Sequence, residues 1–193
     1  SAALRACRLF RDLDDRSITL VTAALRPRRF RRGETVFHAG DPGDALFIVA
    51  AGQVKIVLPY DEGSEPAILT TIGPGGFFGE LALLDGAPRS ATAVALGVVT
   101  TQVLRRGDFD ALIDEHRQGL DACLDGLTEE QARRRLVPSR TTLLGLVKHA
   151  TFVERVWFVE AVTGTSRAAL GLPATPDASF VLDDADTIST VQA

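Results

Sequence analysis

Apolar residues recur at helical spacing near the start of the chain and in short strand-like runs after it. Residues 4–25 carry apolar side chains at intervals of three to four, with no Gly or Pro. This predicts one or two helices, interrupted near Asp14 and Asp15. From Arg31 onward, β-rich runs are bounded by Gly, Pro or Asp. They are GETVFHAG (33–40), DALFIVAAG (44–52), QVKIVLPY (53–60) and AILTTIGPGG (67–76).

Two more apolar runs, ATAVAL (91–96) and VVTTQVLR (98–105), extend this β-rich region, and glycines recur in it about every ten residues. That rhythm is typical of an antiparallel barrel or sandwich. The short segment GELALL (79–84) interrupts the strands and predicts one helical turn. The expected fold class is mainly β with flanking helices, built as an antiparallel β-barrel.

Helical pattern returns after the strands. We expect a helix in DFDALIDEH (108–116) with Asp108 as its N-cap, a second over 119–136 and a third over 141–162. Pro138 separates the last two. The sequence thus predicts a β-barrel domain over 1–118. A helical region of uncertain role follows over 119–193, either a hinge or lid helix, a partial winged helix, or the start of another domain.

Charge and composition narrow the possible functions. The net charge of −4 does not favour nucleic acid as a partner of the whole chain. Two cysteines and three histidines lack metal-ligand spacing, which predicts reduced thiols, no metal and a cytoplasmic location. No apolar run approaches the roughly 18 residues of a membrane span, so no membrane association is expected.

The segment FGELALLDGAPRSATA (78–93) carries the strongest chemical signal. Arg89 is a lone forked cation suited to a phosphate, and Glu80 is an acceptor suited to a sugar hydroxyl. Backbone N–H groups at an exposed helical turn can add donors to the same anion. The sequence therefore predicts a pocket for a phosphate and a ribose, formed by Phe78, Gly79, Glu80, Leu81, Ala82, Arg89, Ser90 and Ala91. The alternative is an internal Glu80–Arg89 ion pair that holds a turn together without any ligand.

This segment resembles the phosphate-binding cassette of the cyclic nucleotide-binding domain family, of the catabolite-activator and protein kinase A regulatory-subunit type. The motif F-G-E-L-A-L at 78–83 and the motif P-R-S-A-T at 88–92 match in order, and GDPGDALFIVAAGQVKI (40–56) resembles the strands before them. The resemblance covers about residues 9–116. It implies a double-stranded β-helix, or jelly-roll, barrel.

The resemblance also implies roles for single residues. Glu80 would accept from the ribose 2′-hydroxyl, and Arg89 would pair with the cyclic phosphate. Ser90 favours cAMP over cGMP as the ligand, with no other cofactor. A helix after the barrel would cover the base, with Arg134 as a weak candidate for that contact, and would form a homodimer.

The end of the chain leaves several functions open. Residues 163–172 and 178–188 resemble parts of a winged helix-turn-helix, yet Asp outnumbers Arg there, so DNA binding is weakly supported. The run RPRRFRR (26–32) favours a solvated strand edge over an anion-binding surface. We expect a regulatory module that is not an enzyme, because the motif holds no nucleophile–base pair. The alternatives are a DNA-binding transcription regulator, a regulatory domain of a larger enzyme or transporter, or a barrel for a non-nucleotide ligand.

Overall fold

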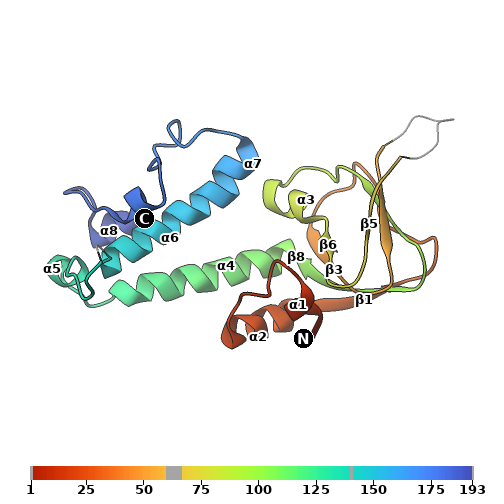
Figure 1. The fold of residues 1–193 in the computed structure, drawn as a ribbon, viewed down its shortest axis with the longest axis horizontal. Coiled ribbons are helices and arrows are strands. Elements are labelled where there is room, and N and C mark those ends of the chain that lie inside the picture. The colour runs from red at the N-terminus through yellow and green to blue at the C-terminus, as the bar shows by residue number, and fades with distance from the viewer. Residues whose placement is uncertain (1, 60–66, 140, 193) are drawn as a thin grey trace. The chain divides into compact units, whose positions relative to one another are not determined.

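A computed structural model describes residues 2–59, 67–139 and 141–192 and divides the chain into two compact units, residues 1–112 and 113–193. The sequence analysis had placed the boundary between residues 118 and 119. The first unit contains helices α1 (Ala2–Ala6) and α2 (Asp15–Ala24), two antiparallel sheets, and the short helix α3 (Glu80–Asp85) (Figure 1). Helix α4 (Arg106–Asp121) begins in the first unit and ends in the second.

The two sheets confirm the mainly β fold class, although they do not close into one barrel. One sheet has the order β1-β8-β3-β6 and the other β2-β7-β4-β5, and every pairing is antiparallel. The strands are β1 (Arg26–Phe30), β2 (Thr35–Phe37), β3 (Ala45–Ala51), β4 (Val54–Val57), β5 (Ile68–Ile72), β6 (Phe77–Phe78), β7 (Thr92–Ala95) and β8 (Val99–Arg105).

Strand β3 lies at the centre of the first unit, and both of its faces are therefore buried. Phe47 and Val49 belong to the core between the sheets, while Leu46 and Ile48 belong to a second core under the helices. Phe47 stacks on Phe78 with 5.2 Å between ring centroids. Burial on both faces explains why residues 45–49 form an uninterrupted apolar run instead of alternating with polar residues.

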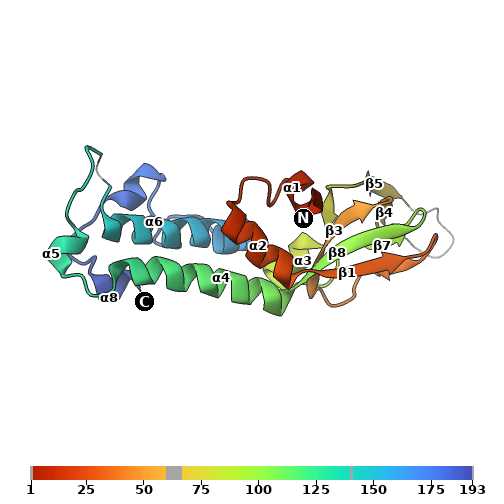
Figure 2. The same ribbon diagram turned by 90° about the horizontal axis from the view of Figure 1, so that it is seen from below.

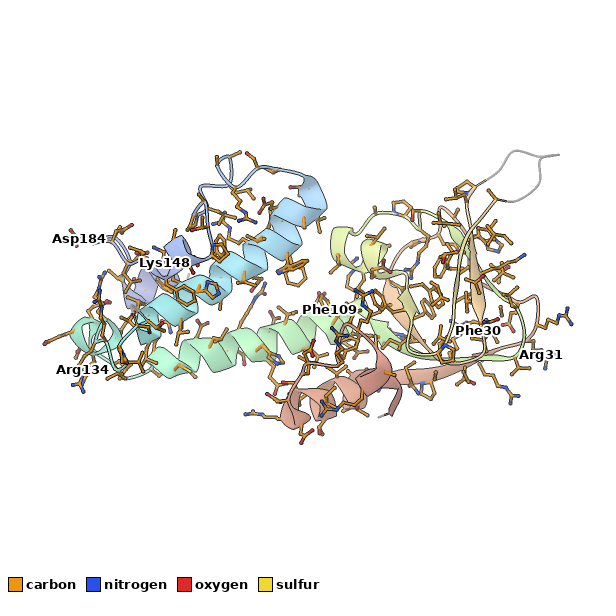
Figure 3. The ribbon with its side chains drawn as sticks, in the orientation of Figure 1. Phe30, Arg31, Phe109, Arg134, Lys148 and Asp184 are labelled. Atoms are coloured by element: carbon orange, nitrogen blue, oxygen red, sulfur yellow. The ribbon has the colours of Figure 1, made fainter. Side chains whose placement is uncertain are left out.

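The arginine-rich run forms the edge strand β1, as the sequence analysis favoured. It pairs only with β8 among the described strands, and four of its five residues are exposed. Phe30 points into the core, whereas Arg31 points outward (Figure 3). Charged side chains along an edge strand oppose pairing with another chain.

The N-terminal helices match the expected break. The carboxylate of Asp14 accepts a hydrogen bond from the backbone N–H of Ser17 at 2.7 Å, which caps α2. Helix α4 begins at Arg106, so Asp108 lies in its first turn and is not the N-cap. The prediction of its start was therefore wrong by two residues.

Residues 119–136 do not form the one continuous helix that was expected. Helix α4 ends at Asp121, the 3₁₀ helix η1 covers Ala122–Leu124, and α5 is only Glu129–Ala132. Gly126 has a φ of +73°, in the left-handed region that ends helices, and Thr128 then starts a new one through a capping box with Gln131. These local signals override the apolar spacing that predicted one continuous helix.

The expected helix over 141–162 is present as α6 (Leu143–Arg155), the π-helical turn η2 (Val156–Glu160) and α7 (Ala161–Thr163). From residue 113 onward, α4 runs beside α6 (Figure 2). Arg117 of α4 forms an ion pair with Glu154 of α6. Leu124, Ala132, Leu144 and Val147 form the small core of this unit. The 3₁₀ helix η3 (Asp177–Phe180) and α8 (Ile188–Val191) complete it, with Lys148 of α6 bonded to Asp186 at 2.6 Å.

The winged helix-turn-helix that the sequence analysis left open as an alternative is not formed. Residues 167–171 make turns in place of a recognition helix, and residues 178–188, which resembled a wing strand and its exit, contain no strand. Asp183 and Asp184 lie in this segment, and Asp184 is exposed. An acidic, turn-rich segment lacks the helix and the positive charge that a DNA-reading surface needs.

The two cysteines differ enough in burial to make a direct test of the fold. Cys7 is fully buried in the core under the helices, and burial raises the pKa of its thiol, whereas Cys123 is exposed. Because the thiolate is the reactive form, we expect a maleimide to label Cys123 rapidly and Cys7 only after unfolding. Mass spectrometry of labelled peptides would show this. Fast labelling of Cys7 in the folded chain would contradict its place in the core.

Candidate ligand cavity

Helix α3 and the loop after it form the centre of the candidate site. Strand β6 ends at Phe78, which pairs with Phe47 of β3, so the chain enters α3 from the core. Gly79 is the N-cap, with a φ of +81°, and a Cβ atom there would lie 2.5 Å from Nη1 of Arg89. Glycine is therefore required both by the backbone conformation and by the closeness of the arginine.

Arg89 is held inside the protein by backbone carbonyls. Its side chain is 3% exposed. Nη1 donates to the carbonyl of Gly79 and Nη2 to the carbonyl of Ala45, each at 2.8 Å. The guanidinium lies 4.3 Å from the ring centroid of Phe37 and 3.9 Å from the carboxylate of Asp44. Strand β3 and helix α3 thus fix the cation in one orientation.

The charge of Arg89 is only partly compensated. Burial lowers the pKa of its guanidinium, the carboxylates of Asp44 and Asp41 act against this, and the nearby charge of Arg106 lowers it further. A guanidinium keeps its proton even so. Its Nε atom is buried and has no hydrogen-bond partner among the described residues. A buried, unpaired, charged donor costs free energy that a bound anion would recover.

Glu80 is free to accept a hydrogen bond from a ligand. It is the first residue of α3 and is half-buried. Within residues 2–59, 67–139 and 141–192, its carboxylate makes no hydrogen bond or ion pair, and the carboxylate that pairs with Arg89 is that of Asp44. The alternative of an internal Glu80–Arg89 ion pair is therefore wrong.

The structure brings the eight residues predicted in the first unit to one cavity of about 180 Å³. Of these, Phe78, Ala82, Arg89 and Ala91 are buried, while Leu81 is 58% exposed at its rim. The sequence analysis missed six further lining residues on the strands, namely Phe37, Ile56, Leu69, Thr70, Ile72 and Phe77. Arg134 follows α5 in the second unit and is not among the residues that line this cavity, so its contact with a base stays a prediction (Figure 3).

The described parts of the chain contain neither a metal-binding cluster nor a membrane-spanning helix. Within residues 2–59, 67–139 and 141–192, no group of three or more His, Cys, Asp or Glu side chains is placed to hold a metal ion. No helix among the described residues is both long and apolar enough to cross a membrane.

An antiparallel jelly-roll fold with an arginine-containing cavity at a short helix defines a cyclic nucleotide-binding domain. The family model described as "Cyclic nucleotide-binding domain" matches residues 27–116. The chain is 33% identical over 173 residues to the "Cyclic AMP receptor protein" of Thermus thermophilus, and this match covers 82% of the chain and 80% of that relative. The chain belongs to the cyclic nucleotide-binding family of the catabolite-activator and protein kinase A type.

Two further matches concern the first unit. Over 104 residues the chain is 40% identical to the "CRP-like cAMP-activated global transcriptional regulator" of Mycobacterium tuberculosis, a match that covers 54% of this chain and 45% of that protein. The N-terminal domain of a transcriptional regulator from Streptomyces coelicolor has a similar structure. Its TM-score is 0.56 at 35% identity, with 60% of this chain and 82% of that one covered. The chain thus spans about half the length of the mycobacterial relative.

Two different similarities concern the second unit. A match over 82% of the chain must extend beyond residue 112, so the similarity to the Thermus protein enters this unit. A second family model, described as "Mycothiol-S-transferase", matches residues 108–193. This match covers less than half of the chain and does not by itself assign the unit to that family.

Proposed function

We propose that the first unit binds a cyclic mononucleotide, with cAMP preferred over cGMP, and that the protein is a cytoplasmic regulator. The observation that carries the proposal is the buried guanidinium of Arg89 beside the unpaired carboxylate of Glu80. The cation suits a phosphate and the carboxylate suits a ribose hydroxyl. The names of the relatives, a cAMP receptor and a cAMP-activated regulator, support the choice of ligand.

The size of the cavity supports a specific placement of the ligand. Its volume of about 180 Å³ is below the roughly 300–1,000 Å³ of cavities that enclose a drug-sized molecule. The cyclic phosphate and ribose would therefore occupy the cavity, with the phosphate at Arg89, Ser90 and the start of α3. The base would extend along the side chains of Ile56, Leu69 and Thr70.

Calorimetric titration of the 193-residue chain with cAMP and then cGMP tests this function. We expect micromolar or tighter binding of cAMP and weaker binding of cGMP, together with an increase in melting temperature, because a ligand of the native state stabilises it. The absence of both heat and thermal shift with either nucleotide at high concentration would contradict the proposal.

The role of Glu80 gives a sharper test of the ligand's orientation. We expect Glu80→Gln to weaken cAMP binding by about tenfold, since a hydrogen bond to a charged group is worth roughly 1.5–3 kcal/mol. 2′-Deoxy-cAMP should bind the unaltered chain and the variant with similar affinity, because the hydroxyl that Glu80 accepts from is absent. A variant that discriminates between the two nucleotides as strongly as the unaltered chain would contradict the assignment.

The proposal also concerns a second copy of this chain and DNA as possible partners. A regulator of this family would act as a homodimer through helices after residue 107, and analytical ultracentrifugation with and without cAMP would show this. The names of the relatives support a general role in the regulation of transcription. Direct DNA contact by residues 163–188 is not supported, because no winged helix is formed there.

A second candidate function concerns the second unit alone and is favoured by the mycothiol-S-transferase match. Within this unit a groove of about 670 Å³ lies between α4 and α6, lined by apolar side chains that include Trp157, with the Arg117–Glu154 ion pair at its wall. Incubation of the chain with mycothiol and an electrophile would test for transfer. Product formed only at the uncatalysed rate would contradict this second function, and the regulatory role would be the one function proposed.

A further inference from the structure

We propose that Arg106 is the positioning residue that transmits occupancy of the cavity to helix α4. This inference rests on the proposed cyclic nucleotide ligand. It concerns a residue outside the matched cassette that does not line the cavity. Arg106 is the first residue of α4, and its half-buried side chain extends back to the middle of α3.

The contacts of Arg106 join three segments. Nη2 donates both to the carbonyl of Ala82 in α3 and to the carbonyl of Gly43, the latter at 3.3 Å. Its backbone N–H donates to the carbonyl of Asp44 at 2.8 Å. The start of α4 is therefore tied both to the helix that carries the site and to the chain just before β3.

The same short segment is held from the ligand side by Arg89. Its guanidinium bonds to the carbonyl of Ala45 at 2.8 Å and lies 3.9 Å from the carboxylate of Asp44. Residues 43–45 thus lie between two arginines, one at the cavity and one at the start of α4. A change in the position of either guanidinium acts on the same three residues.

Close packing makes this connection stiff. A Cβ atom on Gly43 would lie 1.9 Å from Cβ of Ala82, so residues 43–45 and α3 are in direct contact with no space between them. Close-packed elements transmit a displacement from one to the other, because the interior has low compressibility. The aromatic ring of Phe109, one turn further along α4, packs against the core under the helices (Figure 3).

Charge gives the direction of the effect. The positive charges of Arg89 and Arg106 repel each other across residues 43–45. Arg106 accordingly lowers the pKa of Arg89, although burial lowers it more and the opposing effects of Asp44 and Asp41 are also larger. A phosphate bound to Arg89 neutralises that repulsion. Ligand binding therefore strengthens the hold of Arg106 on Ala82 and Gly43 and orders the first turns of α4.

Hydrogen exchange of the full chain, followed by mass spectrometry with and without cAMP, tests the inference. In the unaltered chain, cAMP should slow exchange in peptides from α3 and from the start of α4 by about fivefold or more, the usual size of a coupling between sites. In Arg106→Ala, cAMP should still slow α3, while α4 stays within about twofold of its ligand-free rate. A purely structural role would not separate the two peptides in this way.

Two matched variants complete the design. Arg105→Ala removes the same charge from the adjacent, exposed residue and should behave as the unaltered chain. Arg106→Lys keeps the charge but cannot hold two carbonyls in the same geometry, and it replaces Arg106→Ala if that variant does not fold. Retention of the α4 response in either Arg106 variant, or no α4 response in a chain that binds cAMP, overturns the inference.

The role of Arg106 can be tested even if the protein does not bind a cyclic nucleotide. If calorimetry detects no cyclic nucleotide, the ligand-free chains still test the connection, because Arg106→Ala should speed exchange in both α3 and the start of α4, whereas Arg105→Ala should not. Equal exchange in these two variants would overturn the role of Arg106 whatever the ligand is.

Discussion

Arg89→Ala is expected to weaken cAMP binding by about 30-fold to several thousand-fold, because loss of a desolvated charged partner costs roughly 2–5 kcal/mol and 1.4 kcal/mol is a factor of ten. The phosphate would lose the cation that faces it, and no other arginine or lysine lines the cavity among the described residues. Calorimetry on the purified variant measures the effect. Affinity within a few-fold of the unaltered chain would contradict the site.

The structure predicts a second effect of the same substitution. The carbonyls of Gly79 and Ala45 would lose their donors, and the fold would lose the contact with the ring of Phe37. A fall in the free energy of unfolding of about 1–3 kcal/mol is therefore expected in the absence of ligand. Arg89→Lys separates charge from geometry, since an ammonium cannot make the forked contacts. The exposed Arg105→Ala is the control for a change in net charge.

The local features of the first unit could be predicted from the sequence because short-range chemistry determines them. Asp14 followed by Ser17 specifies the cap of α2, and the glycine before Glu80 specifies the turn into α3. The β-rich runs became strands in the expected places. Their closure into two sheets instead of one barrel depends on pairing between distant segments, which a run of apolar residues does not encode.

The surroundings of Arg89 could not be predicted because its partners are backbone atoms. The sequence analysis considered Glu80 as an ion-pair partner of Arg89, but the guanidinium is held by carbonyls, one of them 44 residues earlier in the chain. The strand residues that line the cavity, such as Ile56 and Thr70, carry no chemical signal of their own. Only the register of β4 with β5 brings them to the site.

In the second unit, the sequence contains local helix stop and start signals that decide the structure more strongly than apolar spacing does. Gly126 and the pair Thr128 and Gln131 specify a helix stop and a helix start within 119–136. Apolar spacing suggested one helix, yet a left-handed glycine and a capping box decide the outcome locally. The missing winged helix has a similar cause, since turns and acidic side chains occupy the segments that resembled it.

Gly43→Ala is expected to destabilise the protein and weaken cAMP binding together. The added Cβ would lie 1.9 Å from Cβ of Ala82 and 3.0 Å from the carbonyl oxygen of Ala87, so α3 would have to move. Overpacking of this kind costs roughly 1–3 kcal/mol. Because Glu80 and Leu81 lie in the same helix, its displacement would also disturb the cavity. Gly97→Ala is the matched control, since a Cβ there would meet nothing within 4 Å.

The double variant Gly43→Ala with Ala82→Gly identifies the colliding atom. Ala82→Gly alone should cost about 1 kcal/mol as a glycine within a helix. The double variant should be more stable than the sum of the single effects by roughly 0.5–3 kcal/mol, because the glycine removes the Cβ that the new alanine meets. Recovery should be partial, since Cα of Ala82 would still lie 3.0 Å from the added atom. Denaturant unfolding measures all four chains, and strictly additive effects would show that residues 43–45 and α3 are not in direct contact.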